Sequence, residues 1–301
     1  MTPPKHFLEL ANISETELRT IITSGAAFKA GKGETNPLAG KTLAMIFEKP
    51  STRTRVSFEV GMKQLGGEVV VLNQNDLQIG RGETIADTAR VLSRYVDAIV
   101  LRTNHPDKLG ELARNSTVPV INGLTDYSHP IQLLADILTY EEHVGSISQA
   151  RVAWCGDGNN MALTWLQAAM VFGFELSIAS PSELKLPEAE INRARGLGVK
   201  INVVEDPIEA VAGASCVVTD TWVSMGDKES EWRHRLLEPY RVDEALMAHA
   251  NRDAVFMHCL PAHRGEEVTS SVLDGPRSVV WDEAENRLHV QKGILMWCMS
   301  Q

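Results

Sequence analysis

The stretch FEKPSTRTR, residues 47–55, joins a predicted strand to a predicted helix. An apolar run ends at Phe47, Pro50 interrupts the chain, and apolar residues at helical spacing begin at Val56. The N-terminus of a helix offers unpaired backbone N–H groups and the positive end of the helix dipole, and hydroxyl and guanidinium groups add further donors. This junction therefore predicts a site for an oxyanion, phosphate in particular. The alternative is a capped, solvated helix start with scattered basic residues.

Strands and helices alternate along the chain. Strands are predicted at Thr42–Phe47, Glu68–Leu72, Ala98–Leu101, Val118–Ile121, Val152–Cys155, Glu175–Ala179, Lys200–Val204, Cys216–Thr219, Val255–His258 and Val279–Trp281. Helices are predicted after the capping box Ser14–Glu17 and at Arg53–Leu65, Thr84–Tyr95, Pro106–Ala113, Pro130–His143, Ala162–Phe172, Pro187–Leu197 and Glu283–Met299. Such alternation is typical of parallel sheets covered by helices on both faces.

Two such series predict an α/β protein with two doubly wound parallel-sheet domains. We expect the first domain at residues 1–147 and the second at 148–301, with the helix at about 283–299 packing back on the first. Doubly wound sheets bind ligands at the carboxyl ends of their strands. The active site is therefore expected in the cleft between the two domains.

The composition excludes several classes of protein. The chain has 301 residues and a net charge of −10, whereas nucleic-acid binders usually show a basic stripe. It contains no run of 18 apolar residues, so a transmembrane helix is not expected. The four cysteines form no CxxC pair, which argues against a zinc site or a disulfide framework. Scattered cysteines fit a reducing cytoplasm.

Polar side chains follow several of the predicted strands. Arg102 comes directly after one strand, and His129 and Gln132 begin the helix that follows another. Either an anion ligand or a surface cation would explain Arg102. An imidazole at a helix start can polarise a carbonyl oxygen, although an isolated histidine is more often structural.

The segment GDGNN, residues 156–160, resembles half of a dinucleotide-binding fingerprint. The third glycine is missing, because position 161 is Met, and no acidic residue follows the next strand in the ribose-binding position. We therefore interpret the segment as a tight turn that directs asparagine side chains into the cleft.

Of two later loops, one could bind an amino acid and the other contains a cysteine that could act as a nucleophile. The segment DTWVSMG, residues 220–226, places a carboxylate and a hydroxyl four residues apart, which suits the two charged ends of an amino acid. Its alternative is a turn or helix cap. The segment HCLPAHRG, residues 258–265, pairs a cysteine with a histidine and raises the hypothesis of a thiolate nucleophile. Adjacent residues of a strand point to opposite faces, which weakens that pair.

Taken together, these segments resemble the aspartate/ornithine carbamoyltransferase family over nearly the whole chain. Six motifs occur in the family's order: FEKPSTRTR (47–55), HPIQ (129–132), GDGNN (156–160), DTWVSMG (220–226), HCLPAHRG (258–265) and DEAENR (282–287). HCLP and SMG are typical of the family members that act on ornithine. The resemblance implies transfer of the carbamoyl group of carbamoyl phosphate to the δ-amine of ornithine, which yields citrulline and phosphate in arginine metabolism.

The resemblance also implies roles for individual residues. Carbamoyl phosphate would be bound by Ser51, Thr52, Arg53, Thr54, Gln78, Arg102, His129, Gln132, Cys259, Leu260 and Arg287, with Gln78 reaching into a neighbouring subunit. Ornithine would be bound by Asn160, Asp220, Ser224 and Met225. The catalytic residues would be Arg53, Arg102, His129, Asp220 and Cys259.

The implied enzyme is a cytoplasmic homotrimer or a multiple of trimers, without a metal or an organic cofactor and without nucleic-acid or membrane partners. Three other readings stay open at this point. The chain could carbamoylate another amine, act as a non-catalytic binding or regulatory homologue, or be a thiol enzyme centred on Cys259. The charged residues of every motif are present, which is not expected of a non-catalytic homologue.

Overall fold

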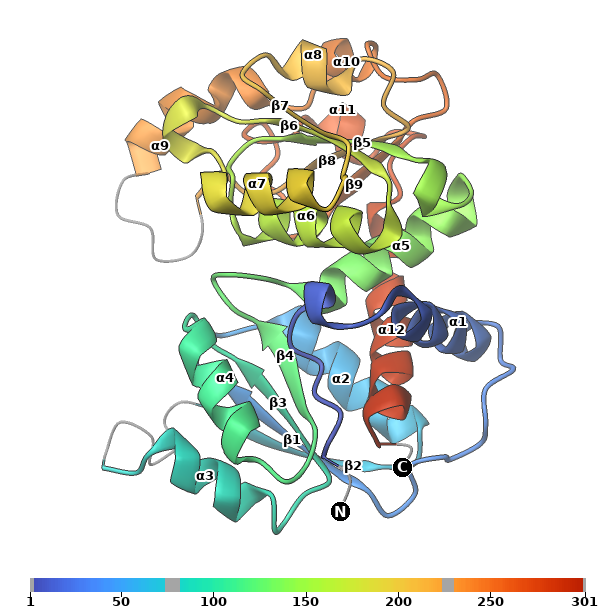
Figure 1. Ribbon diagram of the computed structural model, residues 1–301. Coiled ribbons are helices and arrows are strands. Elements are labelled where there is room, and N and C mark those ends of the chain that lie inside the picture. Colours follow the sequence, from blue (N-terminus) through green and yellow to red (C-terminus); the bar gives the residue numbers. More distant parts are fainter. Residues whose placement is uncertain (1–2, 74–81, 224–229, 300–301) are drawn as a thin grey trace. The chain divides into compact units, whose positions relative to one another are not determined.

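The computed structural model describes residues 3–73, 82–223 and 230–299. The chain divides into two compact units, Met1–Ala135 with Asn286–Gln301 and Asp136–Glu285. Each unit is built on one parallel sheet flanked by helices (Figure 1). Two helices, α5 (Pro130–His143) and α12 (Val280–Met299), have their residues divided between the units.

The first unit has a four-stranded sheet in the order β2-β1-β3-β4. Its strands are β1 (Thr42–Phe47), β2 (Glu68–Asn73), β3 (Ala98–Arg102) and β4 (Val120–Leu124), and every pair is parallel. Its helical segments are η1 (Leu10–Asn12), α1 (Glu15–Lys29), α2 (Thr52–Gln64), α3 (Ile85–Leu92) and α4 (Pro106–Asn115). Because alternate residues of a strand face opposite sides, Ala44 and Ile46 pack in the cluster that includes Leu109 and Leu112 of α4.

The second unit has a five-stranded parallel sheet in the order β7-β6-β5-β8-β9. Its strands are β5 (Arg151–Cys155), β6 (Glu175–Ala179), β7 (Ile201–Val204), β8 (Cys216–Thr219) and β9 (Val255–His258). Its other helical segments are η3 (Ile147–Gln149), α6 (Asn160–Phe172), η4 (Ser182–Leu184), α7 (Glu188–Gly196), α8 (Pro207–Val211), α9 (Ser230–Leu237), η5 (Glu238–Tyr240), α10 (Glu244–Met247) and α11 (Ser270–Leu273).

Helices α1 and α12 of the first unit pack very closely because glycines lie at their contact. A Cβ atom at Gly293 would lie 2.3 Å from the carbonyl oxygen of Ile21, and one at Gly25 would lie 3.0 Å from that of His289. Phe7 adds an edge-to-face contact with Trp297 at 6.4 Å between ring centroids. These contacts hold the part of α12 that follows Glu285 in the first unit.

The predicted α/β fold with two parallel sheets is confirmed, and nine of the ten predicted strands occur within three residues of their predicted bounds. The strand predicted at Val279–Trp281 is wrong, because α12 begins at Val280. Only an isolated parallel bridge between Phe256 and Ser278 joins the chain to β9 at this point. A three-residue apolar run fits a strand or the buried first turn of a helix equally well.

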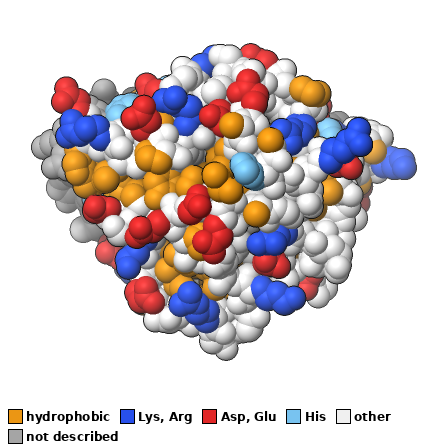
Figure 2. All heavy atoms as spheres, turned by 90° about the horizontal axis from the view of Figure 1, so that it is seen from above, with side chains coloured by type: hydrophobic (Ala, Val, Ile, Leu, Met, Phe, Trp, Pro, Cys, Tyr) orange, Lys and Arg blue, Asp and Glu red, His pale blue; other side chains and the backbone are white. Residues whose placement is uncertain are grey.

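The surface carries both charges and some exposed apolar side chains. On the face shown in Figure 2, acidic and basic side chains are interspersed rather than separated by sign. Val56 and Val60 of α2 and Val70 of the edge strand β2 are exposed in the first unit. None of the helices in the described part of the chain has the length and apolar character that crossing a membrane requires.

Candidate active site

The N-terminus of α2 lies directly after β1, as the FEKPSTRTR stretch predicts. Ser51 caps the helix, and its hydroxyl accepts a hydrogen bond from the backbone N–H of Thr54 at 3.4 Å. Thr54 is completely buried, whereas Thr52 and Arg53 are exposed in the first turn. The first turn of α2 therefore presents hydroxyl, guanidinium and backbone N–H donors together, which is the arrangement that favours an anion.

Two guanidinium groups converge on the hydroxyl of Thr54. Arg287 of α12 donates from Nη2 to Thr54 Oγ1 at 2.7 Å, and Arg102 at the end of β3 donates from Nη1 at 3.4 Å. The side chain of Arg287 is almost completely buried. Buried cations are costly unless hydrogen-bonded, and the Thr54 hydroxyl is one acceptor for both guanidinium groups.

His129 lies beside this cluster at the start of α5 and is almost completely buried. Burial lowers the pKa of His129 well below its usual 6.5. The positive charges of Arg287, Arg102 and Arg53 lower this pKa further. His129 is therefore a neutral imidazole, and Gln132 follows it with a backbone N–H that donates to the His129 carbonyl at 3.1 Å.

His129 should stay neutral when the pH falls through the usual range of histidine. In selectively ¹⁵N-labelled protein, NMR titration should give His129 a midpoint well below 6.5, because burial and nearby cations both disfavour its protonated form. Replacing Arg287 by Gln should raise that midpoint, since one positive charge is removed. Arg114→Gln on α4 serves as the control and should leave it unchanged. A wild-type midpoint near 6.5 would contradict the neutral assignment.

Glu48, within the FEKPSTRTR stretch, joins the end of β1 to the end of β3 through hydrogen bonds. Its carboxylate accepts a short hydrogen bond from Thr103 Oγ1 and one from Lys108 Nζ at 2.8 Å, and its N–H donates to the carbonyl of Arg102 at 3.0 Å. Burial raises the pKa of Glu48, but the bonds from Lys108 and Thr103 outweigh it, so the pKa lies below its usual value. Glu48 thus ties the ends of β1 and β3 together as an ionised carboxylate.

In the second unit, the GDGNN turn leads from β5 into α6 and contacts the end of β8. Gly158 is required there, because a Cβ atom at this position would lie 2.5 Å from the carbonyl oxygen of Leu184. Asn159 caps α6 by accepting from the N–H groups of Met161 and Ala162. Its Nδ2 donates to Asp220 Oδ2 at 2.9 Å, so one asparagine joins the turn to the carboxylate after β8.

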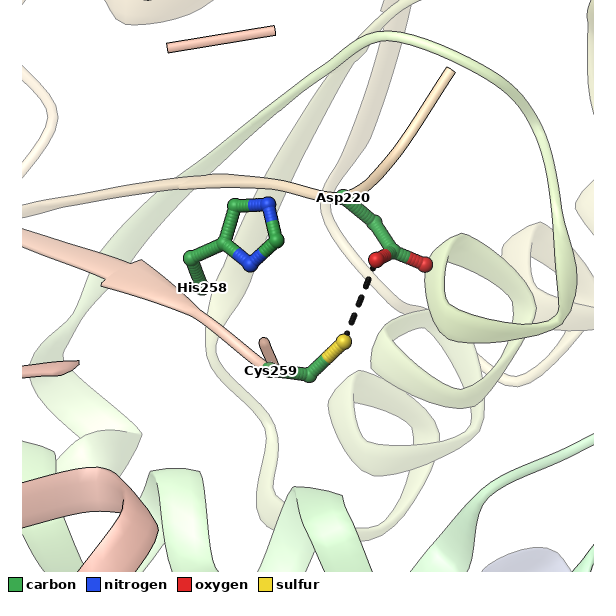
Figure 3. A group of neighbouring side chains, drawn as sticks. All are labelled: Asp220, His258 and Cys259. Carbon is green, nitrogen blue, oxygen red and sulfur yellow. Dashed lines mark hydrogen bonds between the residues drawn. The ribbon is translucent and has the colours of Figure 1, made fainter. Parts of the chain in front are cut away.

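Asp220 also accepts a hydrogen bond from the thiol of Cys259, the residue that follows β9 (Figure 3). The Cys259 Sγ donates to Asp220 Oδ1 at 3.1 Å, and the Thr221 N–H donates to the same oxygen at 2.8 Å. Burial raises the pKa of Cys259 well above its usual 9, and the charge of Asp220 raises it further. Cys259 is therefore a protonated thiol that is hydrogen-bonded to a carboxylate.

Two groups of side chains in the described residues place metal-binding atoms within 4.8 Å of one another. They are Asp220 with His258 and Cys259, and His263 with Glu266 and Glu267. In the first group the thiol is protonated, and both ring nitrogens of His258 have hydrogen-bond partners, Leu260 N–H and Glu267. These groups are arranged for hydrogen bonding, and a metal would have to displace those bonds.

The structure gathers the sequence-predicted residues into two clusters. Ser51, Thr54, Arg53, Arg102, His129 and Arg287 belong to the anion cluster of the first unit, and Asp220, Cys259 and Leu260 form the second. Asn160 is the first residue of α6, next to this second cluster. Gln78, Ser224 and Met225 lie outside the described residues. Sequence reasoning missed the contacts of Glu48 and Asn159, although Asn159 precedes a helix as capping residues do.

The fold is that of an α/β protein with two parallel sheets, and the candidate residues lie in two clusters, one in each unit. Residues 5–142 match the carbamoyl-P binding domain of the aspartate/ornithine carbamoyltransferases, and residues 148–298 match their Asp/Orn binding domain. The chain therefore belongs to the aspartate/ornithine carbamoyltransferase family and is a carbamoyltransferase.

Close relatives and solved structures agree with this family. The ornithine carbamoyltransferase of Rhodopseudomonas palustris is 58% identical over 301 residues, covering 98% of this chain and 97% of the relative. That of Bradyrhizobium diazoefficiens is 59% identical over 298 residues, with the same coverage. The structure of ornithine carbamoyltransferase from Pyrococcus furiosus has a TM-score of 0.95 at 48% identity and covers 99% of this chain and 98% of its own.

Proposed function

We propose that the chain transfers the carbamoyl group of carbamoyl phosphate to the δ-amine of L-ornithine by direct attack through a tetrahedral intermediate, giving L-citrulline and phosphate. The observation that carries the proposal is the convergence of Arg102 and Arg287 on Thr54 at the N-terminus of α2, with neutral His129 beside them. An anion with a carbonyl next to it matches this set of groups. Residues at the ends of β8 and β9 supply the matching site for an amine.

The anion cluster would bind both ends of carbamoyl phosphate. Ser51, Thr52, Arg53 and Thr54 would hold the phosphate, and Arg287 would complete the site. His129, Arg102 and Gln132 would bind the carbamoyl oxygen and the bridging oxygen. Fixed donors stabilise the negative charge that grows on these oxygens in the transition state, and this is usually a large contribution to catalysis.

The second cluster would bind ornithine. The Asp220 carboxylate attracts an ammonium group, and Asn160 would bind ornithine with it. Cys259 and Leu260 would line the reacting centre beside them and would also contact carbamoyl phosphate. Ser224 and Met225 are assigned to the same role. The neutral δ-amine forms the new C–N bond, the C–O bond to phosphate breaks, and the departing phosphate takes the proton of the amine. Because the phosphate accepts this proton, the reaction needs no protein side chain as a base.

The state of Cys259 supports direct attack rather than a covalent thioester. A thiol whose pKa is raised by burial and by a neighbouring carboxylate is a poor nucleophile, since the thiolate is the reactive form. Among the three residues drawn in Figure 3, the single hydrogen bond joins Cys259 to Asp220, and His258 makes none to the thiol. Of these drawn residues, His258 therefore does not act as the base that would activate the thiol of a thiol enzyme.

The purified chain should form citrulline from carbamoyl phosphate and ornithine. Putrescine, aspartate and N-acetylornithine, offered in parallel, should give much slower turnover, and this comparison tests the choice of amine. Mass spectrometry of acid-quenched turnover should find no carbamoylated Cys259, and Cys259→Ser should keep part of the activity. Trapping the carbamoylated thiol would overturn the direct-attack mechanism, and failure to form citrulline would overturn the substrate assignment.

We further propose that the enzyme is a cytoplasmic homotrimer, or a multiple of trimers, in arginine biosynthesis. The exposed Val56, Val60 and Val70 on α2 and β2 support self-association through the first unit, and the free thiols of all four cysteines fit a reducing compartment. Gln78 would then serve the site of a neighbouring subunit. A relative of known structure, 42% identical over 99% of both chains with a TM-score of 0.93, is described as the anabolic enzyme of Campylobacter jejuni.

A further inference from the structure

A buried histidine–glutamate pair lies directly behind the Cys259 turn. His258 and Glu267 have no accessible surface, and His258 Nε2 lies 3.2 Å from Glu267 Oε1. The same carboxylate oxygen accepts a short hydrogen bond from the backbone N–H of His263. One buried carboxylate thus joins both ends of the segment from His258 to His263, which contains Cys259 and Leu260.

The hydrogen bonds of His258 fix where its proton lies. The backbone N–H of Leu260 donates to His258 Nδ1 at 2.9 Å, so Nδ1 must carry a lone pair. The proton therefore lies on Nε2, which donates it to Glu267. A protonated Nδ1 would place two donors against each other. His258 is consequently held in the Nε2–H tautomer, with Leu260 N–H donating on one side of the ring and Glu267 accepting on the other.

This tautomer supports a strained turn at the proposed ornithine site. Leu260 has φ of +58°, in the left-handed region that leucine rarely adopts. The bond from its N–H to His258 Nδ1 holds that conformation, and Cys259 lies between the two bonded residues. The geometry of Cys259 toward Asp220, 3.1 Å from sulphur to oxygen, therefore depends on the acceptor state of His258.

We infer that Glu267 is a positioning residue for the second substrate: it fixes the His258 tautomer and, through it, the Cys259–Leu260 turn against which ornithine is held. The inference rests on the proposed function. Glu267 itself, with no accessible surface, touches neither substrate. Its loss should weaken the ornithine side of the reaction more than the carbamoyl phosphate side, because the phosphate-binding groups of the first unit do not contact it, whereas Cys259 and Leu260 lie in the turn that it holds.

The test compares two neighbouring glutamates by steady-state kinetics. Glu267→Gln replaces the carboxyl group that accepts from His258 Nε2 and His263 N–H with a weaker amide acceptor, and should raise KM for ornithine by about 10-fold or more, the scale of a small displacement in a binding site. KM for carbamoyl phosphate should rise less than KM for ornithine, because the phosphate-binding groups of the first unit do not contact Glu267, and a thermal melt should show that the variant is folded. Glu266→Gln is the matched control. Glu266 is partly exposed and pairs with His234 at 2.8 Å. Its substitution should therefore leave KM for ornithine and KM for carbamoyl phosphate unchanged.

A double-mutant cycle separates positioning from general packing. His258→Asn keeps an amide oxygen near the position of Nδ1 but loses the ring N–H that faces Glu267, so Glu267 no longer holds that acceptor toward the Leu260 N–H. If Glu267 acts through His258, Glu267→Gln combined with His258→Asn should raise KM for ornithine no further than His258→Asn alone. Should Glu267→Gln fail to fold, His258→Asn must by itself show the selective rise in KM for ornithine.

The outcomes distinguish this inference from the function on which it rests. Independent, multiplying effects of the two substitutions would overturn the role of Glu267, and so would a Glu267→Gln variant with lowered thermal stability and unchanged KM for ornithine. A wild-type chain that forms no citrulline would instead overturn the proposed function, and this inference with it. Normal wild-type turnover with equal effects of Glu266→Gln and Glu267→Gln would overturn the inference alone.

Discussion

Replacing Asp220 by Asn should lower kcat/KM for ornithine by about 10²- to 10³-fold, or about 3 to 4 kcal/mol, which is typical when one partner of a hydrogen-bonded charge pair is neutralised. The structure explains why the amide cannot substitute for the carboxylate. Oδ1 already accepts from Thr221 N–H and the Cys259 thiol, and Oδ2 accepts from Asn159. In either orientation, the new NH₂ group would face a donor.

The measurement is initial-rate kinetics with each substrate varied in turn. KM for carbamoyl phosphate should change little, because the anion cluster belongs to the first unit. Asp206→Asn is a matched control: Asp206 is exposed and caps α8 by accepting from Ile208 N–H, a role that Asn also performs well. If Asp220→Asn and Asp206→Asn gave the same kinetics, Asp220 would have no place in the ornithine site.

The sequence predicted the elements of the fold well because most of its strands are buried on both faces. Runs such as Leu43–Phe47 and Val152–Cys155 are continuous and apolar, and helical patterns separate them, which leaves few alternatives to parallel sheets. Val279–Trp281 shows the limit of this reasoning. Those residues are apolar because Val279 and Val280 are buried, and burial alone does not distinguish a strand from a helix.

The site was predictable where a motif contains its own chemistry and unpredictable where tertiary contacts create it. Ser51 and Thr54 follow from a hydroxyl at a helix start. Arg287, in contrast, reaches Thr54 across 233 residues of sequence, and its motif alone does not distinguish an anion ligand from a helix-surface charge. Glu267 directly follows Glu266, and nothing in the sequence tells which of these two glutamates is buried against His258. Such assignments require the packed chain.

Replacing Arg53 by Ala should lower kcat/KM for carbamoyl phosphate by at least about 10²-fold, the scale of losing one donor to an oxyanion. The guanidinium of Arg53 is exposed in the first turn of α2, and no acidic side chain among the described residues pairs with it. It lies close enough to His129 to act on the pKa of that imidazole. Its charge is therefore available to a bound phosphate, which becomes more negative as the C–O bond breaks.

Two further variants separate the shape of Arg53 from its charge. Arg53→Lys keeps the charge but loses the bidentate fork, so it should recover part of the lost activity and remain well below the wild type. Lys63→Ala removes one positive charge from the other end of α2, where Lys63 pairs with Glu59 at 3.1 Å, and should leave kcat/KM nearly unchanged. Equal losses in Arg53→Ala and Lys63→Ala would mean that the helix contributes only a diffuse positive field. A loss confined to Arg53 would identify a direct contact with the leaving phosphate.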